Sequence, residues 1–139
     1  MKTRLKPRPK RLKMPPVKRK RSRHAILLDK AVTTFNRWIR ERDKKLLGGK
    51  CYTCLTGEGS EAGHWRHNNN ATKFHEKLVR LQCTKCNRYL SGNLASYTLR
   101  LVREHGQEQV DEWYKLSFTT KTFTIGELQE IITKYSPTD

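Results

Sequence analysis

The sequence lacks the segments that would hold a protein in a membrane or carry it out of the cell. No apolar run approaches the roughly 20 residues that a membrane-spanning helix needs. The basic N-terminus is not followed by the apolar stretch of a secretory signal. We therefore expect an intracellular protein with no membrane partner, in a compartment where thiols stay reduced.

Apolar residues are also scarce. Hydrophobic residues make up 35% of the 139 positions and charged residues 31%, so one compact domain would have only a small core. Domains with so little to bury usually need a disulfide framework or a bound metal ion. The four cysteines are the residues that could supply this constraint.

Acidic residues are absent from the first 24 positions, which hold 12 Lys or Arg. The rest of the chain has 18 basic and 13 acidic residues, so most of the formal net charge of +17 lies in this tail. A polycation releases counterions when it binds a phosphate backbone, and that binding needs no particular base sequence. The tail therefore predicts a nucleic-acid partner, with an anionic membrane surface as the alternative.

Composition and periodicity separate the N-terminal part of the chain into two segments. Residues 1–23 are rich in Lys, Arg and Pro and are predicted to be a disordered basic tail. Residues 24–49 contain an amphipathic helix, predicted from Ala25 to Leu47, that ends at two glycines. This helix is our predicted dimer interface.

The remaining residues form two further segments. Residues 50–113 hold the cysteines, with strands expected near residues 62–66 and 78–82 and a helix after the last cysteine. Residues 114–139 are a C-terminal extension, in which Thr124-x-x-Glu127 matches a capping box that opens a short helix.

Two Cys-x-x-Cys pairs, Cys51 with Cys54 and Cys83 with Cys86, are separated by 28 residues. Each pair can chelate one ion from a tight turn, and two such turns complete a tetrahedron. Because the expected compartment is reducing and the core is small, we favour a structural zinc ion over two disulfides or four buried free thiols. A four-cysteine site is coordinatively closed, so the zinc is expected to stabilise the fold without catalysing a reaction.

Two polar residues with catalytic potential lie between and directly after these pairs. If Cys54 and Cys83 share one ion, His64 near the end of a first strand and Asn87 at the start of the next helix are drawn toward one another in a ββα arrangement. A neutral imidazole can deprotonate water, and an amide oxygen can bind a hard cation. Metal-assisted phosphodiester hydrolysis requires these two groups.

Several unusual strings in residues 50–113 carry a family resemblance. They are Glu61-Ala62-Gly63-His64-Trp65, Lys73-Phe74-His75-Glu76, the segment from Cys83 to Leu94, and the segment from Gly106 to Glu112. In this order they resemble the NinG/Rap family of lambdoid phage recombination endonucleases. The resemblance implies an α+β fold with a small zinc-bound ββα (His-Me finger, HNH-type) core flanked by helices. It also implies cleavage of branched DNA such as Holliday junctions and D-loops, by a phage-encoded enzyme in the host cytoplasm.

The resemblance also implies roles for single residues. His64 matches the general base, and Asn87 matches a ligand of a catalytic Mg²⁺ or Mn²⁺, with Glu61 as the second ligand. The family typically has Asp where this chain has Glu61, so the carboxylate is kept on a longer arm. The middle motif position, often Asn, is Leu78 here. Paired cuts on a substrate with two-fold symmetry imply a homodimer.

Residues beside the proposed site have open roles. The segment Ser91-Gly92-Asn93 fits either a phosphate-binding turn or a kink between two helical pieces. His67 and His75 are further candidates for the site. The residues expected to hold the scissile strand are Arg66, Lys85, Arg88 and Asn93.

The tryptophans divide into two groups. Trp38 and Trp113 lie on apolar helical faces and are expected in the core. Trp65 follows His64 directly, so it either packs in the core or stacks on an unpaired base.

Two other functions fit parts of the sequence. A non-catalytic zinc module that coats DNA or RNA would account for the tail and the cysteines, but it leaves the combination of Glu61, His64 and Asn87 to chance. A general HNH nicking endonuclease without branch preference would contain the same site residues. Cleavage tests on a four-way junction, a D-loop and a linear duplex distinguish these functions.

Overall fold

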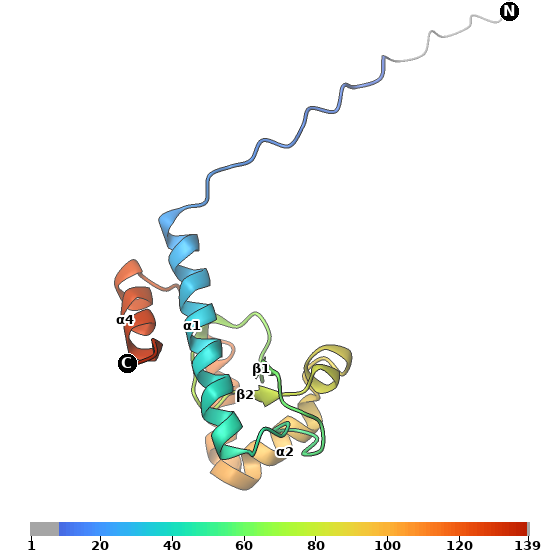
Figure 1. Ribbon diagram of the computed structural model, residues 1–139, viewed down its shortest axis with the longest axis vertical. Coiled ribbons are helices and arrows are strands. Elements are labelled where there is room, and N and C mark those ends of the chain that lie inside the picture. The colour runs from blue at the N-terminus through green and yellow to red at the C-terminus, as the bar shows by residue number, and fades with distance from the viewer. Residues whose placement is uncertain (1–8, 139) are drawn as a thin grey trace, which may run out of the picture.

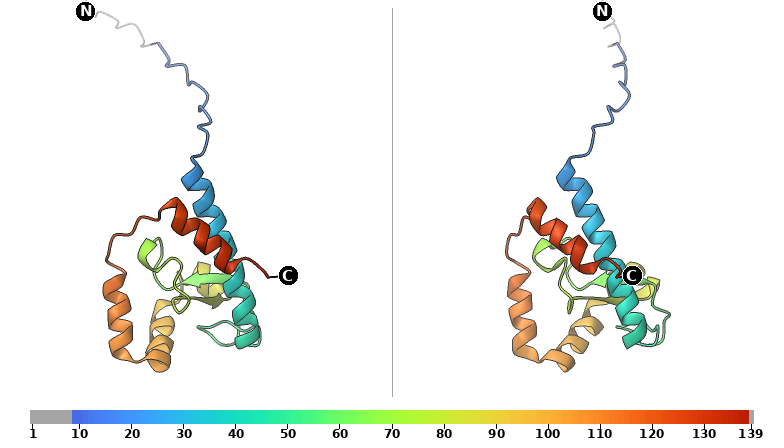
Figure 2. Two further views of the ribbon diagram at one scale, coloured as in Figure 1. Left: turned by 90° about the vertical axis from the view of Figure 1, so that its left-hand side faces the viewer. Right: turned by 60° about the vertical axis from the view of Figure 1, so that its left-hand side comes forward.

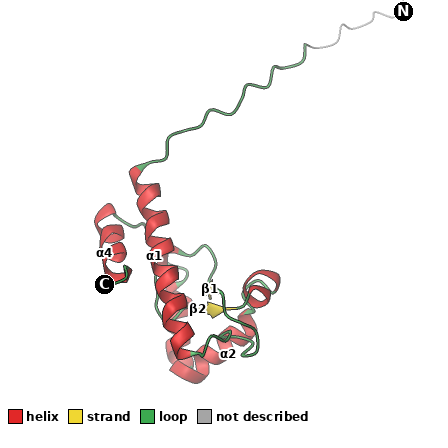
Figure 3. Cartoon of the chain, viewed as in Figure 1, coloured by secondary structure: helices red, strands yellow, loops and turns green. Residues whose placement is uncertain are grey.

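The computed structural model describes residues 9–138. Residues 9–22 form no helix or strand and extend away from the body of the protein (Figure 1). The part of the disorder prediction that concerns residues 1–8 lies outside the described residues. The body is α+β and consists of four α-helices, two short helical turns and one two-stranded sheet (Figure 3). None of the described helices has the length and apolar character needed to cross a bilayer.

The first helix, α1 (Arg23–Leu46), begins two residues before the predicted start. Its N-terminus is capped by Ser22, whose side chain accepts a hydrogen bond from the Ala25 backbone N–H. Gly48 and Gly49 both have positive φ angles, a conformation that side chains with a Cβ rarely adopt, so the helix ends where the glycines predict. The helix forms a long rod against which the sheet and α4 pack (Figures 1 and 2).

The sheet pairs β1 (Glu61–His64) with β2 (Val79–Gln82) in an antiparallel register that sets Glu61 opposite Gln82 and His64 opposite Val79. Both strands were expected, but β1 ends two residues earlier than predicted. The chain turns away after Trp65, whose backbone N–H makes the last cross-strand hydrogen bond, to the Leu78 carbonyl. A short 3-10 turn, η1 (Asn70–Thr72), lies in the connection to β2.

The helical segment expected after the last cysteine is divided in two. A five-residue π-helical turn, η2 (Lys85–Tyr89), comes first, and α2 (Leu94–His105) follows it. Ser91, Gly92 and Asn93 separate them, all with positive φ. Each of the three also donates its backbone N–H to a carbonyl of the same segment. The kink interpretation is therefore correct, and the phosphate-binding turn is not, because these N–H groups are already used.

The C-terminal helices are α3 (Gln107–Leu116) and α4 (Ile125–Tyr135). The segment boundary placed after residue 113 falls inside α3, because the polar sequence of this helix gave no clear periodicity. The predicted capping box is confirmed: Thr124 accepts from the Glu127 backbone N–H, and the Glu127 side chain accepts from the Thr124 N–H.

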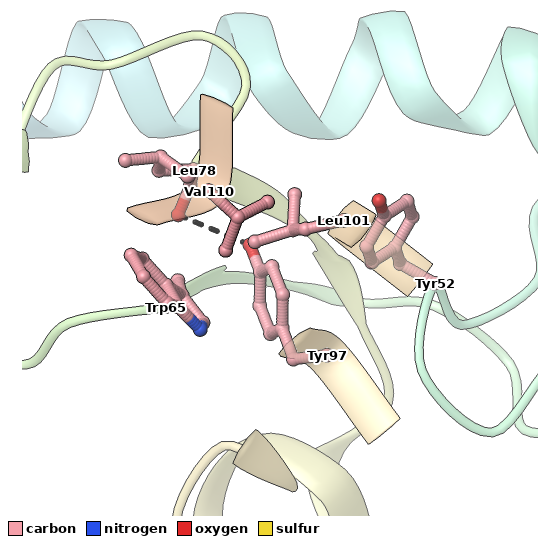
Figure 4. Packing of buried hydrophobic residues seen from close by; sticks show 6 residues of the cluster. All are labelled: Tyr52, Trp65, Leu78, Tyr97, Leu101 and Val110. Carbon is pink, nitrogen blue, oxygen red and sulfur yellow. Dashed lines mark hydrogen bonds between the residues drawn. The ribbon is translucent and has the colours of Figure 1, made fainter. Parts of the chain in front are cut away.

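The main clusters of buried side chains lie on both sides of the sheet. Toward α1 and α4 the buried residues are Phe35, Ile39, Val79 and Tyr135. Toward α2 and α3 they are Tyr52, Trp65, Leu78, Tyr97, Leu101 and Val110 (Figure 4).

Tyr97 connects α2 to both strands. Its hydroxyl is buried and lies 3.0 Å from the Gly63 carbonyl and 3.1 Å from the Leu78 carbonyl. Trp65 is buried, with 5% of its surface exposed, and its indole N–H donates to Thr98 Oγ1. Trp65 therefore packs in the core and does not present its face to an unpaired base. Trp38 and Trp113 pack against the apolar clusters, as expected.

A buried ion pair fixes the end of α1 to β2. Asp43 is fully buried, and its carboxylate accepts hydrogen bonds from Arg80 Nε at 2.8 Å and the Leu81 backbone N–H at 2.9 Å. Arg42 donates to the same carboxylate. Burial opposes ionisation, but the hydrogen bonds from Arg80 and Arg42 outweigh it, so the pKa of Asp43 is lowered.

Candidate functional site

The two Cys-x-x-Cys pairs meet in one cluster. The Sγ atoms of Cys51, Cys54, Cys83 and Cys86 all lie within 4.8 Å of one another, and no pair is bonded as a disulfide. The Cys54 and Cys83 sulfurs are 3.8 Å apart. Zinc–sulfur bonds of about 2.3 Å in a tetrahedron require sulfurs about 3.8 Å apart, so the cluster could hold a metal ion such as zinc.

The backbone around the cluster suits thiolate ligands. The Gly57 N–H donates to Cys54 Sγ at 3.2 Å. Burial raises the pKa of Cys54, but this and other backbone donors outweigh burial and lower the pKa to about 6. A methyl group on Gly57 would lie 2.8 Å from Cys83 Sγ, which explains the glycine here. Burial raises the pKa of Cys83 to about 12. A raised pKa means that the Cys83 thiolate is unfavourable without a nearby positive charge. If all four cysteines are thiolates, a bound cation must compensate their charge.

Directly beside the cluster, Glu61 of β1 meets Asn87 and Arg88 of η2. Glu61 Oε1 accepts hydrogen bonds from Asn87 Nδ2 at 3.2 Å and from Arg88 Nε at 2.7 Å. The Thr84 hydroxyl, Arg88 and Asn87 together lower the pKa of Glu61, so the carboxylate is charged at neutral pH. The sequence prediction that Glu61 and Asn87 lie together agrees with this contact.

His64 lies at the other end of β1 and is held by a backbone carbonyl. Its Nε2 is 3.3 Å from the Lys73 carbonyl oxygen. A carbonyl can only accept, so Nε2 carries the proton and Nδ1 presents its lone pair. Nδ1 has no hydrogen-bond partner among the described residues. This atom is not fully buried, so solvent can reach it. Burial of the ring lowers the pKa of His64 and keeps it neutral.

His64 does not contact Glu61 or Asn87 through any hydrogen bond in residues 9–138. Side chains alternate along a strand, so Glu61 and Gly63 face η2 whereas Ala62 and His64 face the other side of the sheet. The convergence of His64 with Asn87 is thus limited to their positions at the two ends of one four-residue strand, and their joint action stays a prediction.

Gly63 is required by a close side-chain approach. A methyl group at this position would overlap Gln82 Oε1 and lie 2.8 Å from Gln82 Cγ. Gln82 is fully buried, and its Nε2 donates to the Gly92 carbonyl at 2.8 Å. Gln82 therefore ties the kink before α2 to the sheet next to His64.

The residues expected to grip DNA occupy different environments. Lys85 is exposed on η2, and Arg88 is exposed but paired with Glu61. The Asn93 amide faces Cys86 Sγ at 3.6 Å, so it contacts the cysteine cluster. Arg66 lies over the rings of Tyr114 and Phe118.

The two further histidines also differ. His67 is exposed, with Nε2 3.1 Å from the Ser91 carbonyl. His75 packs its ring against Trp113 and accepts a hydrogen bond from the Lys77 backbone N–H, which fits a structural role.

Three contributors to the site were not predicted from the sequence. They are the Lys73 carbonyl that orients His64, the Thr84 hydroxyl that binds Glu61, and the buried Gln82 side chain. For Gln82, the alternation of β2 offered a signal, because a polar residue in a fully buried strand needs internal partners. The position of the Lys73 carbonyl depends on loop geometry that no side-chain type encodes.

The fold and the site define a small α+β protein with a four-cysteine cluster that could bind a metal, and a strongly basic N-terminal segment. The profile of a family described as "Bacteriophage Lambda NinG protein" matches residues 2–138, almost the whole chain. The chain therefore belongs to the NinG family of lambdoid phage proteins.

Individual relatives agree with this assignment. The chain is 36% identical over 112 residues to "Protein ninG" of Escherichia phage 933W, which covers 78% of this chain and 54% of the relative. It is equally similar to "Protein ninG" of Escherichia phage lambda, with 53% of that protein covered. The match to "Protein ninG" of Salmonella phage P22 is 37% over 89 residues, 61% of this chain and 42% of the relative. The chain thus spans about half the length of the curated relatives it matches. No solved structure matches this fold significantly.

Proposed function

We propose that the protein is an HNH-type (His-Me finger) DNA endonuclease that cuts branched recombination intermediates by metal-dependent phosphodiester hydrolysis in the host cytoplasm. The observation that carries this proposal is the placement of a charged carboxylate and a neutral histidine on one short strand, with an amide in contact with the carboxylate, beside the cysteine cluster. Glu61 and His64 are the first and last residues of β1, and Asn87 touches Glu61 from η2.

The donor set fits a hard divalent cation. Glu61 is ionised, and Asn87 Oδ1 has no hydrogen-bond partner among the described residues. Mg²⁺ binds through one or two protein oxygens and keeps several waters, so Glu61 and Asn87 suffice as its ligands, and Mn²⁺ has similar preferences. Such an ion would neutralise charge on the phosphate and the leaving 3′ oxygen. In this proposal Arg88, which pairs with Glu61, would contact the same phosphate.

His64 supplies the base in this proposal. Nε2–H is donated to the Lys73 carbonyl, so Nδ1 is the atom that takes the proton from water. In an in-line displacement the attacking and leaving oxygens lie on opposite sides of the phosphorus. The base and the metal ligands therefore need not touch. Because His64 and Glu61 face opposite sides of the sheet, the proposal requires the phosphate to reach both groups around the edge of β1.

The same proposal assigns a role to the rest of the surface. Lys85 and Arg66 would hold the phosphate backbone, and the N-terminal tail would add affinity that is independent of sequence. Two cuts on a symmetric junction require a homodimer. The buried face of α1 contacts β1, β2 and α4 of the same chain, so a dimer formed through α1 would use its exposed face, which includes Lys30, Arg37 and Lys44.

A cleavage assay tests the proposal. Purified zinc-loaded protein is incubated with Mg²⁺ and a four-way junction, a D-loop or a linear duplex of matched sequence. The control without Mg²⁺ omits the ion rather than adding a chelator, because a chelator would also strip zinc. We expect cleavage of the two branched substrates only. Equal cleavage of the linear duplex would indicate a general nicking enzyme.

A non-catalytic zinc-binding module is the second candidate. The ion pair between Arg88 and Glu61 favours it, because that contact occupies one of the proposed metal ligands. Binding of branched DNA without any cleavage in Mg²⁺ or Mn²⁺ would support this candidate and reject the nuclease.

A further inference from the structure

Two exposed aromatic rings project at the end of α3, next to the proposed nuclease site. Tyr114 is 49% exposed and Phe118 is 65% exposed. Their ring centroids are 4.9 Å apart in an edge-to-face arrangement. Neither ring belongs to an apolar core cluster of the described residues. Adjacent exposed rings form an apolar surface patch, and such patches mark sites where a partner binds.

Arg66 joins the two rings to the nuclease site. Its guanidinium carbon lies 5.4 Å from the Tyr114 ring centroid and 5.5 Å from that of Phe118. Arg66 follows His64 by two residues, which is at most about 7 Å of chain. Tyr114 also packs edge-on against Trp65, the neighbour of His64, at 6.5 Å.

The support beneath the rings is held in place by buried hydrogen bonds. Ser117 is buried between Tyr114 and Phe118, and its hydroxyl donates to the Tyr114 carbonyl at 2.5 Å. The Asn69 side-chain amide donates to the Ser117 carbonyl, which ties the end of α3 to the loop after His64. The rings are therefore presented on a braced backbone rather than on a free loop.

We propose that Arg66, Tyr114 and Phe118 form a stacking platform that receives an unpaired nucleobase at the branch point of the DNA. This inference rests on the proposed function and names the feature that distinguishes branched from linear DNA. Every nucleobase has a π-face that stacks on aromatic rings and on a guanidinium plane, and stacking needs no base sequence. In a fully paired duplex these faces are covered by neighbouring base pairs, so only a branch or a single-stranded segment can supply one.

The charge of the surroundings selects this occupant. The charge that contacts both rings is the Arg66 guanidinium, two residues along the chain from His64. An apolar protein partner would bury the Arg66 charge, which is costly, whereas a nucleotide brings a phosphate to pair with it. A second copy of this chain would bring the same positive charge to the contact.

The platform is tested by binding without cleavage. The 139-residue chain, in zinc-containing buffer without Mg²⁺, is titrated into a flapped duplex that carries 2-aminopurine as the first unpaired base, and into a fully paired duplex. Wild-type protein should quench the 2-aminopurine by stacking on it. Phe118→Ala should abolish the quenching and weaken flap binding by roughly five- to hundredfold, the range for loss of one stacked base. Phe118→Trp should keep both.

Two controls make the result specific. Leu46→Ala removes an apolar side chain of similar exposure, 67%, at the far end of α1 from the tail, and should change nothing. Since Phe118→Ala removes no charge, affinity for the paired duplex and the dependence on salt should stay at wild-type values. Equal flap binding by wild type and Phe118→Ala would overturn the platform. A changed oligomeric state of Phe118→Ala with unchanged flap binding would also overturn it, and would assign the rings to a second copy.

Failure of the nuclease proposal would look different. Phe118-dependent quenching with no cleavage of any substrate in Mg²⁺ keeps the platform on a DNA-binding module. Cleavage of branched DNA that is indifferent to Phe118→Ala keeps the nuclease and rejects the platform.

Discussion

Replacement of Gly63 by alanine tests the packing that places His64. The Gly63 φ angle is not positive, so alanine is allowed by the backbone, and the obstacle is the Gln82 side chain. A methyl group would lie 2.8 Å from Gln82 Cγ, whereas carbon atoms in contact are normally about 3.5–4.0 Å apart. Gln82 must therefore retreat, although it is fully buried and bonded to the Gly92 carbonyl.

Two costs add in this variant. Overpacking costs about 1–3 kcal/mol, and leaving the Gly92 carbonyl without its donor costs about 1–3 kcal/mol more. We expect Gly63→Ala to lower the free energy of unfolding by about 2–6 kcal/mol. In the Gln82→Ala background the obstacle is gone, so Gly63→Ala should cost less than about 1 kcal/mol. The difference between the costs in the two backgrounds is the coupling energy, which should be at least about 1 kcal/mol.

Urea unfolding followed by circular dichroism measures all four proteins of this cycle at one fixed zinc concentration, because bound metal shifts apparent stability. Gly126→Ala is the matched control, since a methyl group there meets nothing closer than Thr124 Oγ1 at 3.9 Å and lies in α4. It should be neutral or stabilise by up to about 1 kcal/mol. If Gly63→Ala costs the same in both backgrounds, to within about 0.5 kcal/mol, the Gln82 contact does not explain the glycine.

Three further variants test other parts of the structure. Cys83→Ser, or zinc removal by a chelator, should unfold residues 50–100, because metal binding supplies folding free energy here. Elemental analysis that shows no zinc in folded wild-type protein would contradict this prediction. Deletion of residues 1–20, which keeps the Ser22 cap, should weaken binding to every DNA form and flatten the salt dependence of affinity; selective loss of junction binding would count against it. Asp43→Asn leaves Arg80 facing a neutral partner in the interior, so it should lower the free energy of unfolding in urea by about 3–5 kcal/mol. The control Asp29→Asn changes an exposed residue and should cost less than about 1 kcal/mol. Equal costs would contradict the view that the buried ion pair supports the fold.

Local features of the sequence predicted the parts of the fold that local interactions determine. The amphipathic period gave α1, the two glycines gave its end, and Thr124 with Glu127 gave the start of α4. The Cys-x-x-Cys spacing predicted a metal cluster because chelation by paired thiolates has few geometric solutions. The same spacing predicted that His64 and Asn87 would converge, whereas the contact that the structure shows joins Asn87 to Glu61, which only the family resemblance had placed with it as a metal ligand.

Contacts between distant segments were not predictable in the same way. The break between η2 and α2 arises from three successive positive φ angles, and only Gly92 signals one of them. Asp43 reads as a polar residue on the basic face of a helix, yet it is fully buried because Arg80, from another element, meets it. The tautomer of His64 is set by the backbone carbonyl of Lys73. A backbone carbonyl is present at every residue, so the sequence does not show which one His64 meets.

The most direct test of the nuclease proposal compares wild-type protein with His64→Ala on a four-way junction in Mg²⁺. Because burial lowers the pKa of His64, the imidazole is neutral above a midpoint below pH 6.5, so wild-type cleavage should fall as the pH drops through that midpoint and level off near neutrality. His64→Ala should cleave roughly a hundredfold or more slowly at pH 7.5 and lose the acid limb, with junction affinity and zinc content unchanged. Equal cleavage by the two proteins, after a mock purification has excluded host nuclease, would contradict the assignment of His64 as the base.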